Sequence, residues 1–301
     1  MSQSHAPLQV DRLRALTLDP QAHPRGQPHL SAASGLVCAH GRAYVIGDDE
    51  HHLAVFRDRA SPGELVRVVA GDLAVSKPAR KRRKPDFETL VHLPGNAMLQ
   101  APGSGSRPNR DRGVAVGLSA NGVPAAGTRL FDLAPVYKAL RARLGPINIE
   151  GAFVLGDELV LLQRGQAGQA SMSLHYRLRE WLGVIDRHDA ALQPHALRPF
   201  DLGAIDGVPL TFTDGAALPG GGWVFTAVAE DSDNSYADGP CRGAAVGVVA
   251  ADGTLLSMRR LIGGDKVEGI AVRVDGNGTA MFMVTDADDP AQASWLLSAW
   301  L

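Results

Sequence analysis

Hydrophobic positions in this chain fall in short runs separated by glycine-containing turns, a pattern typical of many short β-strands. The apolar run 270–274 is followed by a turn, a second and more hydrophobic run at 280–284, and a polar cluster that begins at Thr285. The same order of strand, turn, strand and polar cluster recurs at 36–50 and at 216–231. The sequence therefore predicts one β unit that is repeated along the chain.

Each unit begins with a polar, usually acidic, residue, a small residue and an apolar strand. The small residues of the five copies are Gly35, Thr89, Gly151, Gly215 and Gly269. Their spacing of roughly sixty residues leaves room for four strands in each unit, which is the size of a propeller blade. We therefore predict an all-β fold, a β-propeller of five blades with four antiparallel strands each, that occupies residues 1–301 as one domain. A sixth, eroded blade is the alternative.

Two further features complete the predicted fold. Closing the ring removes free sheet edges, so we expect the last strand, 295–301, to pair with an N-terminal strand. The segment 132–144 has Leu133, Val136 and Leu140 at helical spacing, and it predicts one short helix with Asp132 as its N-cap and Gly145-Pro146 at its end.

Composition narrows the function classes. Hydrophobic residues make up 45% of the chain, and no apolar run is long enough to cross a bilayer. Without a visible secretory signal we expect a soluble cytoplasmic protein that has no membrane partner. The net charge of −2 gives no general attraction to nucleic acid, so none is expected as a partner. The basic run 77–84 is interpreted as a solvated loop, because no aromatic residue interrupts it.

Acidic residues at the start of the units are the candidate metal ligands. Equivalent positions of a propeller form a ring at one end of the axis, and this ring would hold Ser34, Glu88, Glu150, Asp214 and Glu268. Four carboxylates in one ring repel each other unless a cation, arginines, raised pKa values or backbone N–H donors compensate. Ca²⁺ or Mg²⁺ is one hypothesis, because both ions prefer oxygen ligands. The alternative is that the acids accept backbone hydrogen bonds as latches between blades.

The polar clusters and long loops supply the candidate ligand-binding residues. We expect the clusters that follow the second strands to lie toward the opposite end of the axis. The long loops 102–112 and 231–242 are where specificity usually resides. Among the arginines, Arg107, Arg110, Arg112, Arg164 and Arg242 are candidates for binding a small anionic molecule, because guanidinium groups suit phosphates and carboxylates. Glu230 and Asp286 complete the candidate ligand-binding set; for any single arginine, the alternative is a solvent-exposed ion pair.

At the Glu-Gly pairs that begin units, Glu150-Gly151 and Glu268-Gly269, the chain resembles a broad group of propellers. The group includes the gluconolactonase and regucalcin-like hydrolases, the paraoxonase-like lactonases, the esterase-like phytase domains and the SdiA-regulated bacterial proteins. More narrowly, the segments Asp86–Leu90, Gly103–Ser106 and Asn148–Gly151 resemble an uncharacterised bacterial propeller family. The lactonase-like members imply a calcium ion held by a Glu at the start of an innermost strand. The matching positions are Glu150 and Glu268, and more weakly Glu88 and Asp214. The further Asn and Asp ligands of those families have no identified counterpart here.

Two functions follow as hypotheses. The first is a hydrolase that uses a divalent metal ion to cleave a lactone, ester or phosphoester, with no organic cofactor. The second is a propeller without catalysis that binds a small molecule or a protein. No GxSxG motif or paired Ser and His supports a serine hydrolase, and no catalytic residue is assigned.

Overall fold

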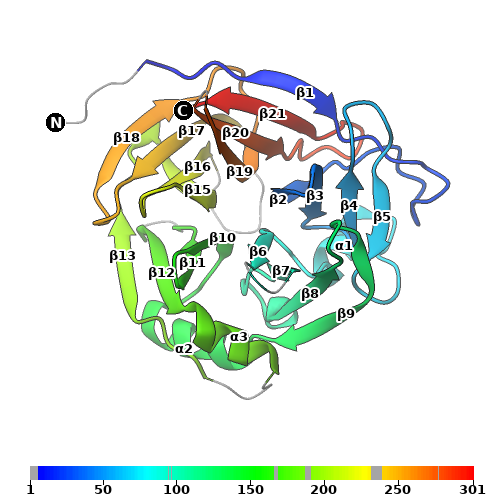
Figure 1. Ribbon diagram of the computed structural model, residues 1–301, viewed down its shortest axis with the longest axis horizontal. Coiled ribbons are helices and arrows are strands. Elements are labelled where there is room, and N and C mark those ends of the chain that lie inside the picture. The colour runs from blue at the N-terminus through cyan, green and yellow to red at the C-terminus, as the bar shows by residue number, and fades with distance from the viewer. Residues whose placement is uncertain are drawn as a thin grey trace.

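Five small antiparallel sheets are arranged in a ring around a central axis (Figure 1), as predicted. The computed structural model describes residues 6–93, 95, 97–165, 169–186, 191–231, 239–276 and 278–301. In chain order the innermost strands are β2, β6, β10, β15 and β19. The fold is thus the five-bladed β-propeller that the sequence repeat indicates.

Blades 1 and 2 come from the first half of the chain. Blade 1 consists of β2 (Ala33–Ala39), β3 (Arg42–Gly47), β4 (His52–Phe56) and β5 (Glu64–Arg67). Helix α1 (Lys77–Arg83) leads into blade 2. Blade 2 consists of β6 (Val91–Leu93), β7 (Met98–Pro102), β8 (Arg112–Leu118) and β9 (Pro124–Asp132), with the short 3-10 helix η1 (Pro108–Arg110) between β7 and β8.

Blades 3, 4 and 5 follow, and two helices flank blade 3. Helix α2 (Ala134–Leu144) precedes β10 (Ile149–Leu155), β11 (Glu158–Gln163), β12 (Ser171–Arg177), helix α3 (Leu178–Asp186) and β13 (Ala196–Phe200). Blade 4 has five strands, β14 (Ala204–Ile205), β15 (Val208–Ala217), β16 (Trp223–Glu230), β17 (Cys241–Val249) and β18 (Leu255–Arg260). Blade 5 contains β19 (Val267–Asp275), β20 (Gly278–Thr285) and β21 (Trp295–Trp300).

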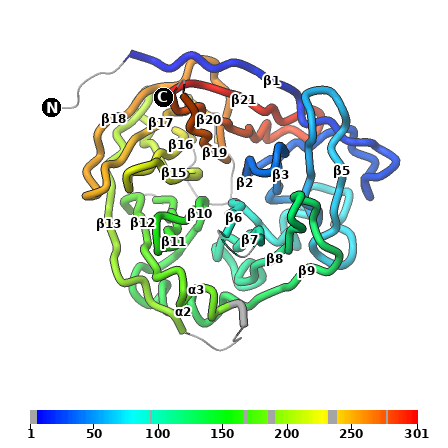
Figure 2. The backbone as a smooth tube through the Cα atoms, viewed as in Figure 1, coloured from blue at the N-terminus to red at the C-terminus, as the bar shows by residue number. Residues whose placement is uncertain are grey.

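The ring closes where the two ends of the chain share blade 5. Strand β1 (Asp11–Ala15) pairs with β21 in antiparallel orientation and forms the outer edge of that sheet (Figure 2). Asp11 lies opposite Ser298, and Ala15 lies opposite Trp295. The predicted closure by an N-terminal strand and the last strand is therefore confirmed.

The hydrophobic core consists of five clusters, one at each interface between successive blades. The cluster between blades 2 and 3 also contains the helices, because Val136 and Tyr137 of α2 and Trp181 of α3 are fully buried in it. Trp181 donates its indole N–H to Gln100 of β7 at 3.0 Å, which satisfies the one polar atom of that ring. Each blade is thus stabilised by packing against its two neighbours.

The helices only partly follow the sequence prediction. Helix α2 lies within the predicted segment and its apolar face is buried. Its N-cap is Leu133 rather than the predicted Asp132, although the Asp132 carboxylate accepts the N–H of Ala134 at 2.9 Å. Helices α1 and α3 were not predicted, and α1 replaces the expected solvated loop. None of the helices in the described ranges is long and apolar enough to span a bilayer.

Candidate functional site

A cavity of about 130 Å³ lies on the axis, at the end where the innermost strands begin. Charged side chains from all five blades line it. The carboxylates are Asp48, Asp49, Asp86, Glu88, Glu150, Glu230, Glu268, Asp286, Asp288 and Asp289. The basic groups are Lys77, Arg80, Lys81, Lys84, Arg110, Arg164 and Lys266. With ten acids and seven bases, the wall has an excess of acidic groups.

The polar clusters after the second strands line this same cavity, and the expectation that they lie toward the opposite end is wrong. In an antiparallel hairpin the second strand returns to the edge where the first one began. Asp48 and Asp49 after β3, Glu230 at the end of β16 and Asp286 after β20 therefore lie at the end where Glu150 and Glu268 begin their strands. The ends of two strands per blade build the wall.

Bulges in the innermost strands position two of the predicted acids. The pairing of β10 with β11 skips Glu150, and the pairing of β19 with β20 skips Glu268. A bulged residue is unpaired in the ladder and its side chain is re-aimed. Both Glu side chains line the cavity, as does Glu88 just before β6. Glu88, Glu150 and Glu268, three of the four candidate metal ligands, therefore line one cavity, and their role as ligands stays a prediction.

Asp214 is the exception, and its assignment to the ring of cavity acids is corrected. In blade 4 the bulge falls on Thr213, one residue earlier than the sequence repeat predicts. Asp214 therefore occupies the position of Gly151 and Gly269 in the neighbouring blades. Its buried carboxylate accepts hydrogen bonds from the N–H groups of Ala152 and Ile270 at 3.3 and 3.2 Å. Asp214 therefore behaves as the blade-to-blade latch of the alternative interpretation.

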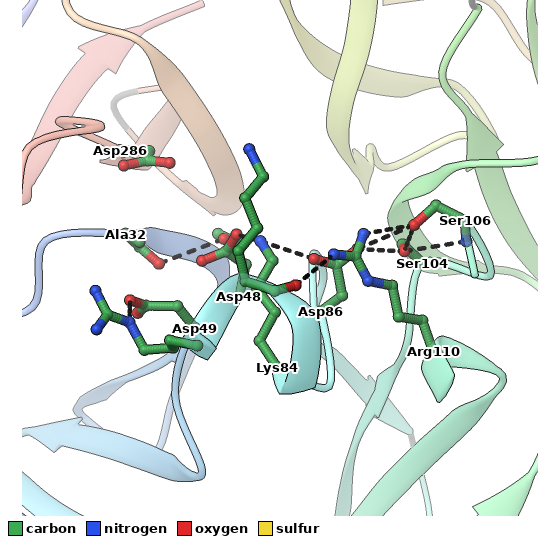
Figure 3. Close-up of polar contacts among 12 residues, drawn as sticks. Ala32, Asp48, Asp49, Lys84, Asp86, Ser104, Ser106, Arg110 and Asp286 are labelled. Carbon is green, nitrogen blue, oxygen red and sulfur yellow. Dashed lines mark hydrogen bonds and ion pairs between the residues drawn. The ribbon is translucent and has the colours of Figure 1, made fainter. Parts of the chain in front are cut away.

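A buried lysine occupies the most compact acidic group in the cavity (Figure 3). Asp48, Asp86 and Glu88 each offer a carboxylate oxygen within 4.8 Å of the others. The ammonium of Lys84 forms ion pairs with Asp48 and, at 2.7 Å, with Asp86. Arg110 donates to the other oxygen of Asp86 at 2.7 Å, and Ser104 donates to it as well. Lys84 therefore neutralises part of this acidic group from within.

Lysine and arginine also bridge the acids on the side of blades 3, 4 and 5. The Lys266 ammonium lies 3.2 Å from Glu268 and 3.1 Å from Asp288, with Glu230 and Asp286 within 4.0 Å. Arg164 pairs with Glu230 at 2.5 Å and with Glu150 at 3.5 Å. Since these bases contact carboxylates of several blades, they hold the wall together electrostatically.

Burial and mutual repulsion change the acidity of the cavity carboxylates. Burial, with the charges of Asp86, Asp48 and Glu150, raises the pKa of Glu88 well above its usual value. Burial also raises the pKa of Asp48 to about 6 and that of Glu268 to about 7, although Lys84 and Lys266, respectively, oppose these shifts. The cavity therefore contains groups that exchange protons near neutral pH.

Residues 29–301 match the model of a family of unknown function, DUF6929. The chain belongs to this family. No curated protein matches it. Among solved structures, it is similar to a bifunctional GH43-CE protein of Bacteroides eggerthii, with a TM-score of 0.51, 10% identity, and coverage of 95% of this chain and 34% of that one.

Two further similar structures have lower TM-scores. The calcium-binding protein regucalcin of Agrobacterium tumefaciens gives 0.45 at 10% identity, covering 98% of this chain and 95% of that one. A gluconolactonase of Xanthomonas campestris gives 0.42 at 11% identity, covering 99% and 98%. At these identities the similarity shows the propeller fold alone.

The remaining candidate residues of the DUF6929 chain divide into two groups. Arg164, Glu230, Asp286 and Arg110 line the cavity, and their role in binding a ligand stays a prediction. Arg107 and Arg112 are not among the lining residues, which corrects their assignment: Arg107 precedes η1, and Arg112 is exposed at the start of β8. Arg242 forms an exposed ion pair with Asp231 at 2.6 Å, and residues 232–238 of the predicted long loop lie outside the described residues.

Helix α1 supplies the cavity residues that the sequence analysis missed. Lys77, Arg80 and Lys81 of α1 occupy positions i, i+3 and i+4, which share one side of a helix. Lys84 is the C-cap residue that follows the helix, and all four residues line the cavity. Arg80 pairs with Asp49 at 2.7 Å. The signal was available in the sequence, because Ser76 before Lys77-Pro78 is a typical helix start. A charge run that looks solvated is here one wall of the cavity.

A second network reproduces the hydrogen-bond order of a serine hydrolase, but it lies outside the cavity. Ser173 Oγ is 2.9 Å from His175 Nε2, and His175 Nδ1 is 2.8 Å from Glu158. Ser173 and His175 share one face of β12 because they are two residues apart. Ser173 is fully buried and is not a lining residue, so a substrate has no access to its hydroxyl. The network is structural.

Proposed function

We propose that the axial cavity binds a divalent cation, Ca²⁺ or Mg²⁺, and that the protein is a hydrolase of small lactones, esters or phosphoesters. The observation that supports this proposal is the group of Asp48, Asp86 and Glu88, with oxygens within 4.8 Å of one another on the cavity wall. Carboxylate oxygens are the ligands that both ions prefer. The group differs from the predicted one, because Asp48 and Asp86 replace Glu150, Asp214 and Glu268.

The donors present fit such an ion. The wall has more acids than bases, and the carboxylates of Asp86, Asp48 and Glu150 lie near that of Glu88. A divalent cation would compensate the repulsion between these negative charges. When bound, the ion would polarise a carbonyl or phosphoryl oxygen of the substrate. Asp48, Asp86 and Glu88 would hold it.

Other residues of the cavity have roles that need no ion. Lys77 and Lys81 on α1 attract an anionic substrate to the cavity. Glu268, with a pKa of about 7, can accept or donate a proton at neutral pH. Arg164 is engaged with Glu230 and Glu150, so it positions these carboxylates rather than the substrate.

Thermal unfolding of chelator-stripped protein, with and without millimolar Ca²⁺, Mg²⁺, Mn²⁺ or Zn²⁺, tests the cation site. An ion-specific rise in Tm is expected, because an ion that binds only the folded state stabilises it. Glu88→Gln should reduce the rise, whereas Glu64→Gln, an exposed residue of blade 1, should not. No rise with any ion would overturn the site, and no hydrolysis of lactones, esters or phosphoesters by ion-loaded protein would overturn the activity.

One observation favours the second hypothesis, a binding propeller without catalysis. Lys84, Arg80, Arg110, Arg164 and Lys266 all pair with carboxylates of the wall, and Asp214 is a latch. A wall stabilised in this way can hold a ligand without a reaction. Ligand-induced stabilisation without turnover would identify this function.

A further inference from the structure

Lys84 occupies the place where a cation would bind. Its side chain is 11% exposed, and its ammonium contacts Asp48 and Asp86, which are two of the three proposed ligands. Glu88, the third, has a carboxylate oxygen within 4.8 Å of an oxygen of each of the other two. An ammonium and a divalent cation compete for the same oxygen atoms, and they repel each other when both are near.

We propose that Lys84 is a tethered competitor for the cation site, which a divalent ion enters only by displacing the Lys84 ammonium. This inference rests on the proposed cation site. The ammonium occupies the acidic group in the ion-free protein and keeps its carboxylates from repelling one another. When an ion binds, Lys84 leaves Asp48 and Asp86 and its ammonium moves into the cavity.

The structure provides the means for this exchange. Lysine carries its charge on a flexible stem of four carbons, so the ammonium can move while the backbone stays in place. Lys84 lines the cavity, whose volume of about 130 Å³ can accept the displaced group. Arg110, on the other oxygen of Asp86, remains paired and continues to position that carboxylate.

Competition makes the affinity for the ion lower than the three carboxylates alone would give. Removing the charge of Lys84 should therefore tighten ion binding, by roughly tenfold or more for a charge at contact distance. This direction is diagnostic, because a lysine that only stabilises the fold would give weaker binding or no change when it is replaced.

Calorimetric titration of Ca²⁺ and Mg²⁺ into chelator-stripped protein, comparing wild type with Lys84→Met, tests the inference. Arg57→Gln, which removes one positive charge from an exposed ion pair in blade 1, is the matched control. We expect tighter binding in Lys84→Met and an unchanged Kd in Arg57→Gln. Equal or weaker binding by Lys84→Met, with binding retained in wild type, overturns the competition and leaves the cation site standing.

A second measurement uses the wild-type protein, in case Lys84→Met does not fold. Amine-reactive labelling followed by mass spectrometry reports the accessibility of Lys84, with Lys138, an exposed residue of α2 outside the cavity, as an internal reference. Labelling of Lys84 should increase several-fold when the ion is added, because the displaced ammonium faces the cavity. Unchanged labelling at saturating ion overturns the inference. If neither wild type nor Lys84→Met binds an ion, both the inference and the proposed cation site are overturned.

Discussion

Thr89 Oγ1 of blade 2 donates a hydrogen bond to Asp214 Oδ1 of blade 4 at 3.1 Å, between residues that are both fully buried. Thr89 also accepts the N–H of Ala152 in blade 3, and Asp214 accepts the N–H of Ile270 in blade 5. Residues of four of the five blades therefore meet at this pair. Blades 1, 3 and 5 have glycine at this position of the repeat, whereas blade 2 has Thr89 and blade 4 has Asp214. Only these two blades therefore have a side chain that can form the pair.

Replacing Asp214 with alanine should destabilise the whole ring. The change leaves the N–H groups of Ala152 and Ile270 without a carboxylate acceptor in a buried place. A loss of about 3 kcal/mol in the free energy of unfolding is expected, since each unsatisfied buried donor costs about 1–3 kcal/mol. Denaturant unfolding measures it. A loss below that of an exposed change such as Asp231→Ala would contradict the latch.

Glycine at the start of β19 is required by the close approach of blades 5 and 1. A Cβ on Gly269 would lie 2.6 Å from the carbonyl oxygen of Ser34, which is backbone and cannot easily move. Gly269→Ala should therefore lower stability by about 1–3 kcal/mol, as overpacking does. A Cβ on Gly276 would meet nothing within 4 Å, so Gly276→Ala is the control with little expected change. Equal Tm values for both variants would refute the close approach.

The raised pKa of Glu268 predicts a pH dependence with a definite sign. Between its usual pKa of 4.5 and the folded value of about 7, Glu268 holds a proton only in the folded state. Its contribution to stability is therefore present at low pH and is lost as pH rises through about 7, by up to about 3 kcal/mol.

Comparison with Glu268→Gln isolates this contribution from that of the histidines, whose lowered pKa values act in the opposite direction. Urea unfolding from pH 4.5 to 8, in the presence of a chelator, should show wild type losing stability relative to the variant. Parallel curves would be inconsistent with the assigned shift.

Arg80 should be essential for holding α1 against blade 1, whereas the nearby Arg82 should not be. Arg80 is buried and pairs with Asp49, while Arg82 is exposed. Breaking a buried pair by removing one partner costs about 3–5 kcal/mol. Arg80→Ala should therefore lower Tm clearly and Arg82→Ala should leave it nearly unchanged, as measured by thermal unfolding. Similar Tm values for the two variants would show that α1 is not held by this pair.

The propeller could be predicted from the sequence because each repeat contains the same local features. These features are turns, apolar strands and a small residue at roughly equal spacing. Glu150 and Glu268 could be placed for the same reason, since each precedes its glycine in the repeat. Asp214 was misplaced because residue type alone does not reveal that its strand bulges one residue earlier.

The rest of the cavity depends on information that a linear pattern does not carry. Lys84 and Lys266 each gain a carboxylate partner from a neighbouring blade, Asp48 for Lys84 and Glu230 for Lys266, only once the blades have packed together. The interpretation of segment 77–84 as a solvated loop was wrong. The charge pattern of this segment does not show that acidic residues from other blades face it. The helical spacing of Lys77, Arg80, Lys81 and Lys84 was a usable signal.

The pair of Thr89 and Asp214 also separates the stability of the ring from the chemistry of the cavity. Both side chains are buried where four blades meet, and neither is among the residues that line the cavity. A substitution of either residue therefore alters how the blades pack without removing a charged group of the cavity. Any change in ligand binding that follows such a substitution reports how far the wall depends on the ring that carries it.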